Sequence, residues 1–275
     1  MAGADSAALG AAELLADADR PGGWLLLVDR IRQSYVDLDD PTYLDFEYMQ
    51  AFADVLNELP PGPLAVTHVG GGACALARYI ATIRPGSPQI VLEPDAALIK
   101  LVRARLPLPR GARVRIRPVT GRSGVAALRA RSADVVVLDA FHGGRVPADL
   151  STVEFCADVA RVLRPHGVLL ANLADGPPRT YSRRLAATIH TALPELLAVA
   201  DPAVLKGRRF GNIVFAASRQ PLPAAQLRRA TARAPVPRVV RGGYGDGAAP
   251  LTDADSMRSP APPEHSWRVV DEEEL

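Results

Sequence analysis

Residues 64–95 read LAVTHVGGGACALARYIATIRPGSPQIVLEPD, which is the pattern of a strand, a glycine turn, a helix and a second strand that ends in an acid. The mostly apolar run over 64–69 suits a parallel strand that is buried on both faces of a sheet. Three glycines, Gly70, Gly71 and Gly72, then allow the backbone to turn tightly and to approach a ligand, and the helix that follows offers free N–H groups at its start. This stretch predicts half of a nucleotide-binding fold.

Glu93 supports a ligand-binding interpretation of the glycine turn. It follows the glycines by about 20 residues, the distance at which a carboxylate at the end of the second strand accepts hydrogen bonds from ribose hydroxyls. The spacing Gly70-x-Gly72-x-x-Ala75 also fits the loose dinucleotide fingerprint, which is a weak signal when it stands alone. We therefore predict a nucleoside site, with a glycine turn that binds no ligand as the alternative.

Composition narrows the class of protein and its partners. The chain has 275 residues, 48% of them hydrophobic and 23% charged, which is close to globular averages. The net charge of +2 favours no particular partner, and lysine occurs only at Lys100 and Lys206. No run that mixes aromatic and basic residues suggests a nucleic-acid partner. Cys74 and Cys156 are the only cysteines and cannot form a familiar zinc site, so no metal is expected.

No apolar stretch is long enough for a bilayer and no signal-peptide pattern is present, so we expect a cytoplasmic protein without a membrane partner.

The order of patterns along the chain predicts four parts. The expected parts are a flexible N-terminal arm over 1–23, a small β-hairpin and helix over 24–60, a Rossmann-like nucleoside-binding catalytic domain over 61–234, and a flexible C-terminal tail over 235–275.

Strands and helices alternate through the main domain. The expected strands cover 64–69, 89–92, 113–117, 133–138 and 168–173; the expected helices cover 73–83, 95–105, 125–131, 152–163 and 182–193; a closing strand pair covers 196–200 and 212–217. Such alternation predicts an α/β fold with a doubly wound, parallel sheet of the class I methyltransferase type and an antiparallel edge. Ligands of these sheets bind at the carboxyl ends of the strands.

Asp139 is the most informative acid at those strand ends. It follows the strand over 133–138, so the fold would carry its carboxylate to the rim beside the nucleoside. A carboxylate there can accept a proton from an amine nucleophile or hold a cationic ligand, whereas the alternative is a helix cap or a loop anchor. His142 lies in the glycine-containing loop that follows and is a second candidate base, with an exposed loop histidine as the alternative.

Together these features resemble the polyamine aminopropyltransferases, the spermidine synthase family. The resemblance covers residues 24–219 and is carried by the hairpin with Gln33, the segment LDFEY at 44–48, the triple-glycine turn, Glu93, and Asp139 followed by a loop and by VEF at 153–155.

The resemblance implies transfer of an aminopropyl group from decarboxylated S-adenosylmethionine to a small-molecule amine, with release of methylthioadenosine and without a prosthetic group. It places Gln33, the three glycines, Glu93 and Gly121 at the donor, and Tyr48 and Asp139 at the attacking amine. Chemically, the positive sulfonium activates its own γ-carbon, so the protein mainly has to align the amine and deprotonate it. Members of the family commonly form dimers or tetramers, so a homodimer is expected.

This chain departs from the family pattern at four places. Where the family turn reads Gly-Gly-Gly-Asp-Gly, this chain has Ala73 and Cys74 after the glycines, and the family's acidic Gly-Asp turn is replaced around Thr120-Gly121-Arg122. Where the family has an Asp-Ser-Ser-Asp loop, this chain reads Asp139-Ala140-Phe141-His142. The frequent Tyr-Pro-Ser-Gly stretch of the family is replaced by residues 207–211, GRRFG. Arginines at the acceptor end would repel a dicationic polyamine.

Three hypotheses therefore stand. The first is an aminopropyltransferase with an altered acceptor or weakened activity. The second is an S-adenosylmethionine-dependent methyltransferase, since the absence of an acid at Ala73 would ease entry of that donor's carboxylate. The third is a noncatalytic nucleoside-binding protein. We favour the first because the similarity covers the N-terminal unit as well as the nucleotide fold.

Overall fold

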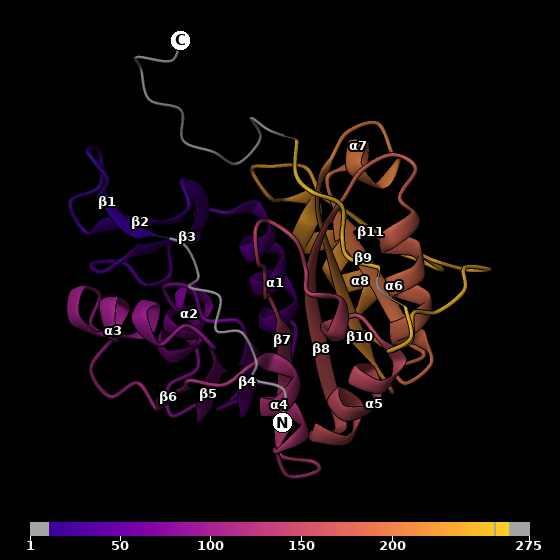
Figure 1. Ribbon diagram of the computed structural model, residues 1–275, viewed down its shortest axis with the longest axis horizontal. Helices are drawn as coiled ribbons and strands as arrows, with labels where there is room; N and C mark the ends of the chain where they lie inside the picture. The colour runs from indigo at the N-terminus through magenta and orange to yellow at the C-terminus, as the bar shows by residue number, and fades with distance from the viewer. Residues whose placement is uncertain (1–10, 256, 264–275) are drawn as a thin grey trace.

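The computed structural model describes residues 11–255 and 257–263 (Figure 1). Its main sheet contains β4 (Val66–Val69), β5 (Gln89–Leu92), β6 (Val114–Arg117), β7 (Ala133–Leu138), β8 (Leu163–Asp175), β9 (Glu195–Ala200), β10 (Gly211–Ser218) and β11 (Val239–Gly242). The strands lie in the order β11-β9-β10-β8-β7-β4-β5-β6. Strands β8, β7, β4, β5 and β6 pair in parallel, while β10, β9 and β11 pair antiparallel. The predicted parallel sheet with an antiparallel edge is confirmed.

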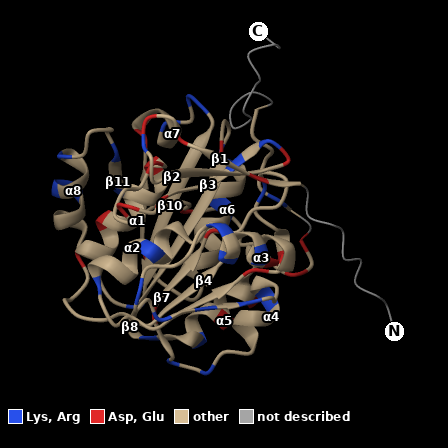
Figure 2. Ribbon diagram, turned by 90° about the vertical axis from the view of Figure 1, so that its left-hand side faces the viewer, with Lys and Arg blue, Asp and Glu red and all other residues tan. Residues whose placement is uncertain are grey.

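Helices cover both faces of this sheet. Core packing places α1 (Glu47–Asn57), α2 (Ala75–Ile83), α3 (Ala96–Arg105) and α8 (Ala224–Ala232) on one face, and α4 (Gly121–Ala126), α5 (Val153–Val162), α6 (Thr180–His190) and α7 (Pro202–Leu205) on the other. Strand β7 shows why both layers form, because Val135 and Val137 pack into the first layer while Val136 and Leu138 pack into the second. Figure 2 shows α1 and α8 in the same layer, with charged residues mainly on helices and loops.

Local sequence signals set the helix starts. The Asp95 carboxylate accepts hydrogen bonds from the backbone N–H groups of Ala97 and Leu98 and so caps α3. The Thr152 hydroxyl accepts one from Phe155 and caps α5. Both helices therefore begin directly after a strand end or loop on the site side of the sheet.

A three-stranded antiparallel sheet precedes the main domain and lies at the upper left of Figure 1. It consists of β1 (Ala12–Ala16), β2 (Gly23–Val28) and β3 (Ile31–Asp37). Asp29 and Arg30 have φ angles of 51° and 62°, the left-handed conformation that a two-residue hairpin requires, and this confirms the predicted hairpin. Strand β1 lies within the expected flexible arm over 1–23, and it is ordered by pairing with β2. Residues 1–10 lie outside the described part of the chain.

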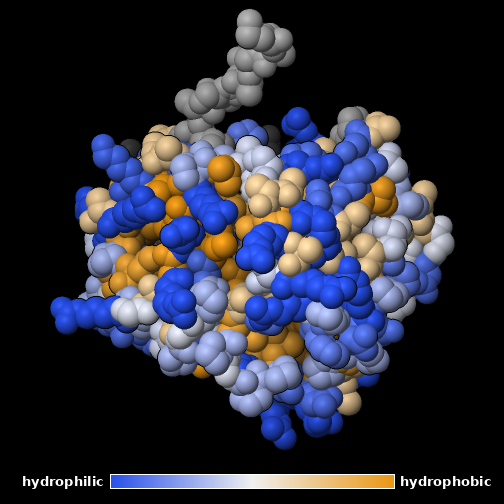
Figure 3. Space-filling view, turned by 90° about the horizontal axis from the view of Figure 1, so that it is seen from below, coloured by the Kyte–Doolittle hydropathy of each residue, from blue (hydrophilic) through white to orange (hydrophobic). Residues whose placement is uncertain are grey.

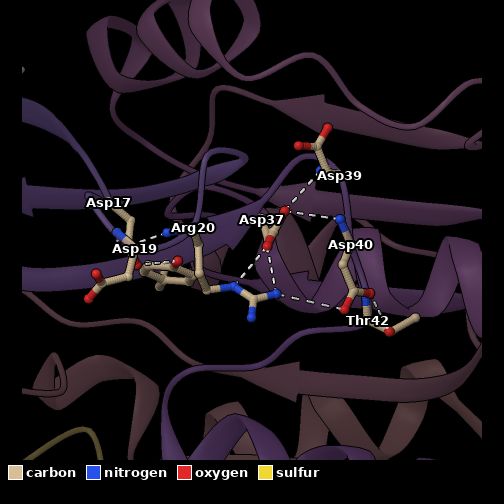
Figure 4. Close-up of polar contacts among 8 residues, drawn as sticks. Asp17, Asp19, Arg20, Asp37, Asp39, Asp40 and Thr42 are labelled. Atoms are coloured by element: carbon tan, nitrogen blue, oxygen red, sulfur yellow. Dashed lines mark hydrogen bonds and ion pairs between the residues drawn. The ribbon is translucent and has the colours of Figure 1, made fainter.

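A polar cluster fixes the exit of this small sheet toward α1 (Figure 4). Arg20 donates to Asp37 Oδ2 from Nε at 2.9 Å, and its Nη2 lies 2.8 Å from the same oxygen. The other oxygen of Asp37 accepts the backbone N–H groups of Asp39 and Asp40. The turn that leads to the helix carrying Tyr48 is therefore held by one buried carboxylate.

The C-terminal segment differs from the expected flexible tail over 235–275. Strand β11 pairs with β9, and Leu251 is 1% exposed in the main core. The Arg122 guanidinium lies 2.7 Å from Asp253, and the Ser259 hydroxyl accepts the backbone N–H of Val146 at 2.8 Å. The composition is rich in proline and glycine, but a few apolar and polar anchors order the segment. Residues 264–275 lie outside the described part of the chain.

The face seen from below is a mosaic in which hydrophilic side chains are interspersed with apolar ones (Figure 3). Among the described residues, the large hydrophobic side chains that are exposed are Leu15, at 41%, and Val239, at 40%. Within residues 11–255 and 257–263, every helix falls short of the length and hydrophobicity that a membrane crossing requires.

Candidate functional site

Two cavities meet at the carboxyl ends of the parallel strands. The first, which we call the glycine-turn cavity, has a volume of about 390 Å³ and is lined by Gly70, Gly71, Gly72, Glu93, Gly121, Asp139 and His142, among others. The second, which we call the α7 cavity, has a volume of about 480 Å³ and is lined by residues of β3, α1, β8, β9, α7 and β10. Gln33, Tyr48 and Phe141 line both cavities, so the two form one continuous site.

Glu93 is attached to the glycine turn. Its Oε2 accepts the backbone N–H of Gly71 at 2.9 Å, and its Oε1 accepts that of Asp95 at 3.0 Å. Burial raises the pKa of Glu93 above its ordinary value, and these backbone hydrogen bonds only partly oppose the rise. The carboxylate is thus held at the cavity wall, with lone pairs left to accept hydrogen bonds from ligand hydroxyls.

The glycine turn is closely packed between two other segments. Gly70 has φ +97°, and a Cβ there would lie 2.1 Å from the backbone oxygen of Asp139. Gly72 has φ +46°, and a Cβ there would lie 3.3 Å from Cβ of Ser34 on β3. The N-terminal sheet therefore packs against the turn, which explains how Gln33 reaches both cavities.

Gly121 begins α4 at the opposite wall of the glycine-turn cavity. Thr120 caps this helix by accepting the backbone N–H of Ser123. A Cβ at Gly121 would lie 2.4 Å from Cγ1 of Val69, so only glycine lets α4 start this close to β4. The structure thus brings Gly121 beside the cavity with the three glycines and Glu93, as the sequence predicts.

A chain of hydrogen bonds crosses the junction of the two cavities. The Tyr48 hydroxyl donates to Asp139 Oδ2 at 3.2 Å, and Asn172 Nδ2 donates to Asp139 Oδ1 at 2.9 Å. Asn212 Nδ2 then donates to Asn172 Oδ1 at 3.0 Å. These four side chains come from α1, the end of β7, β8 and β10, so the sheet and the first helix together fix the Asp139 carboxylate.

The surroundings of Asp139 suit proton transfer. The carboxylate lines the glycine-turn cavity but is otherwise enclosed by protein. This burial raises its pKa from 3.8 to about 6, against the hydrogen bonds from Asn172 and Tyr48. Burial, followed by the charge of Asp139 and the hydrogen bond to it, holds the pKa of Tyr48 well above its ordinary value. Near neutral pH, Asp139 can accept a proton while Tyr48 remains a hydrogen-bond donor.

His142 has a different position from the other catalytic candidates. Its side chain is exposed at the rim of the glycine-turn cavity, and its backbone forms a tight turn with Arg145. The side chains that hold the Asp139 carboxylate are Tyr48 and Asn172. A catalytic role for His142 therefore stays a prediction.

Ion pairs line the α7 cavity. Arg32 lies 3.0 Å from Asp45, and Arg209 lies 3.2 Å from Asp201. A third cation, Arg238, also lines this cavity and forms a 2.8 Å pair with Asp54 of α1. Both neighbouring arginines noted in the sequence are exposed, but only Arg209 is among the residues that line the cavity.

Sequence reasoning missed two residues of the site, Asn212 and Arg238. A polar side chain at the start of the apolar strand β10 was the available signal for Asn212. Arg238 gave no signal, because it lies in the expected tail. The departure at Ala73 also has a structural setting, since Ala73 is fully buried in the core on the α1 side of the sheet.

Comparisons with known proteins find relatives that share this fold. No protein-family model matches the chain. A probable spermidine synthase from Corynebacterium glutamicum is 32% identical, covers 90% of this chain and 94% of its own, and superposes with a TM-score of 0.83. A polyamine aminopropyltransferase from Chromobacterium violaceum is 29% identical over 193 residues, which cover 68% of this chain and 69% of the relative. Human methyltransferase-like protein 13, in complex with SAH, shares the fold at 20% identity and a TM-score of 0.55, covering 67% of this chain and 89% of its own.

Proposed function

The chain belongs to the spermidine synthase family of polyamine aminopropyltransferases, and we propose that it transfers an aminopropyl group from decarboxylated S-adenosylmethionine to an amine. One observation carries the proposal beyond family membership. Asp139 lines the glycine-turn cavity, and the two side chains that hold it, Tyr48 and Asn172, line the α7 cavity. Its pKa is raised to about 6. A base in this position can serve a donor on one side and an acceptor on the other.

In this proposal the donor occupies the glycine-turn cavity. Glu93 accepts hydrogen bonds from the ribose hydroxyls, Gly70, Gly71 and Gly72 let the nucleoside approach the backbone, and Gln33 contacts the donor between the two cavities. The hairpin that carries Gln33 packs over the turn and encloses this part of the site. Gly121 forms the opposite wall.

The acceptor amine occupies the α7 cavity and reaches the donor beside Asp139. Its nitrogen lone pair attacks the methylene carbon next to the sulfonium, a C–N bond forms, and the C–S electron pair returns to sulfur to give neutral methylthioadenosine. Asp139 takes the proton from the nitrogen, and Tyr48 and Asn172 keep the carboxylate aimed at it. The sulfonium supplies the leaving group, so the protein contributes alignment and proton transfer.

The test is detection by mass spectrometry of methylthioadenosine and S-adenosylhomocysteine. Purified protein is incubated with each donor in turn, decarboxylated or intact, and with a panel of amines. We expect methylthioadenosine only when both the decarboxylated donor and an amine are present. We expect Asp139→Asn to slow its formation by about 10²-fold or more, while Asp158→Asn, a matched change in a surface ion pair on α5, leaves the rate unchanged.

The other outcomes separate the remaining functions. S-adenosylhomocysteine in place of methylthioadenosine would establish methyl transfer. Neither product, with donor binding still measurable by calorimetry, would overturn the proposal and leave a noncatalytic nucleoside-binding protein.

A further inference from the structure

We propose that Ser259 is a positioning residue for the donor. With the residues around it, 251–255 and 257–259, which we call the terminal segment, it holds the loop between β7 and α5 in its ligand-binding position before a donor binds. The inference rests on one part of the proposed function, the placement of the donor's nucleoside in the glycine-turn cavity.

The loop between β7 and α5, residues 139–152, forms a large part of the wall of that cavity. Beyond Asp139, it contributes Phe141, His142, Gly143, Pro147, Asp149 and Leu150 to the lining. Its tip is a turn in which the backbones of His142 and Arg145 bond to each other around two glycines with φ angles of 55° and 72°. A loop with such a tip has few contacts of its own, so its position depends on contacts from other segments.

Ser259 supplies the contact at the middle of the loop. Its side chain is buried, at 0% exposure, and its hydroxyl accepts the backbone N–H of Val146 at 2.8 Å. Its carbonyl oxygen accepts Nη1 of Arg145 at 3.4 Å. Val146 is 1% exposed and packs in the main core, so loss of the hydroxyl would deprive a buried N–H group of an acceptor.

A second set of contacts holds the C-terminal end of the loop. The carbonyl oxygen of Leu251 accepts the backbone N–H of Val153 at 2.9 Å. Arg122 donates to the two carboxylate oxygens of Asp253 at 3.2 and 2.7 Å, and its Nη1 also donates to the backbone oxygen of Asp149 at 3.1 Å. The terminal segment therefore contacts the loop at two separate points.

The terminal segment is itself fixed on α6, beside which the yellow chain runs in Figure 1. Arg184 of α6 lies 3.0 Å from Asp255, and the Thr188 hydroxyl accepts the backbone N–H of Leu251 at 2.7 Å. The loop is thus connected through the terminal segment to a helix of the main core.

This arrangement predicts a preorganised donor site. A ligand that must order a loop loses part of its binding free energy to the lost freedom of that loop, whereas a ligand that meets an ordered loop does not. If Ser259 is removed, the apparent affinity should fall with the fraction of molecules in which the loop is in place. Asp139 is held independently by Tyr48 and Asn172, so the rate of the bound complex should stay the same.

The experiment compares Ser259→Ala with Ser218→Ala. Ser218 is also buried, at 2% exposure, and its hydroxyl donates to the Gly167 carbonyl and accepts the Gln220 N–H, at the end of β10 away from the site. By calorimetry, Ser259→Ala should bind methylthioadenosine about tenfold more weakly, and KM for the donor should rise with kcat unchanged. Ser218→Ala should alter none of these values.

Hydrogen exchange over residues 139–152 separates positioning from a general loss of stability. In Ser259→Ala the loop should exchange faster than in the wild type when no ligand is present, and saturating methylthioadenosine should restore slow exchange. In Ser218→Ala the loop should exchange as in the wild type. Unchanged affinity and exchange in Ser259→Ala, or equal changes in both serine variants, would overturn the inference.

A surface variant covers the case in which Ser259→Ala does not fold. Asp253 is 46% exposed, and Asp253→Asn removes only its ion pair with Arg122. It should weaken methylthioadenosine by about twofold and speed loop exchange, while Asp158→Asn, in the surface pair on α5, should do neither. Equal behaviour of these two variants would also count against the inference. A wild type that binds no methylthioadenosine would refute the donor site and the inference together, whereas binding without turnover would refute the transfer reaction alone.

Discussion

Asp139 combines two demands on one side chain. It must be ionised to accept a proton, yet the protein that surrounds it favours the neutral form and raises its pKa from 3.8 to about 6. Hydrogen bonds from Tyr48 and Asn172 reduce that penalty without removing it. A site of this kind gains reactivity at the expense of the stability of the folded state.

This conflict predicts opposite effects of Asp139→Asn on activity and stability. The folded-state pKa lies above the unfolded one, so the stability linked to this group is complete below about pH 4 and is lost as the pH rises through about 6. At pH 8 the variant should lose about 10² to 10⁴ in kcat/KM and gain at most about 3 kcal/mol of stability, less where cavity water screens the charge. Thermal unfolding of both proteins at pH 8 and pH 5 measures this. A variant less stable than the wild type at pH 8 would contradict the argument.

Tyr48 should set the acid limit of the reaction. Its hydroxyl donates to Asp139 and lowers the pKa of that carboxyl, so Tyr48→Phe should raise the pKa and move the acid limb of kcat/KM from about pH 6 to a higher pH. The matched change Tyr43→Phe affects a ring that stacks on Arg20 in the N-terminal unit and should leave the limb in place. A pH profile of Tyr48→Phe with lower activity but an unmoved limb would show that the hydroxyl acts otherwise.

At the scale of elements, the glycine turn is the piece that joins three segments. It connects β4 to α2, contacts the backbone after β7, and packs against Ser34 of β3. We expect Gly70→Ala to be more damaging than its φ of +97° alone explains, because the new Cβ would lie 2.1 Å from a backbone oxygen.

Gly62 provides the matched control for that prediction. Its φ is +109°, but a Cβ there would meet no atom within 4 Å, so Gly62→Ala carries the backbone strain without the clash. By chemical denaturation we expect a loss of about 1 kcal/mol for Gly62→Ala and about 3 kcal/mol or more for Gly70→Ala. Calorimetry with methylthioadenosine should show weaker binding only for Gly70→Ala. Equal losses of stability would mean that the turn can move away from Asp139.

The elements also show what sequence can and cannot predict. The glycine turn, Glu93 and Asp139 were predictable because each lies at a strand end, and a parallel sheet brings strand ends together. Asn212 was not, because its partner Asn172 is 40 residues away and their contact depends on the antiparallel register of β10. Local pattern fixes where a strand ends but not which polar side chains meet across an edge pairing.

At the scale of the whole molecule, the C-terminal segment closes the structure around the site. Arg238, just before β11, pairs with Asp54, a residue 184 positions earlier on the helix that carries Tyr48. The composition of the C-terminal segment predicted a tail, because its prolines and glycines give no periodic pattern. A few anchoring residues whose contacts lie far away in the sequence cannot be recognised from a local pattern. The segment therefore supports both the core and the α7 cavity.

Substitution of Leu251 gives the sharpest test of whether the C-terminal segment contributes to folding. Leu251 is 1% exposed against the α5 and α6 side of the core, and its backbone N–H donates to the Thr188 hydroxyl at 2.7 Å. Leu251→Ala should therefore lower the free energy of unfolding by about 2 to 4 kcal/mol, the loss typical of a buried leucine. Leu15→Ala, which removes the same atoms from a side chain that is 41% exposed on β1, should lower it by less than about 1 kcal/mol. If urea denaturation gave similar small losses for both variants, the segment after residue 235 would contribute little to folding. A large loss for Leu251→Ala alone would confirm that the segment after residue 235 contributes to the folded core.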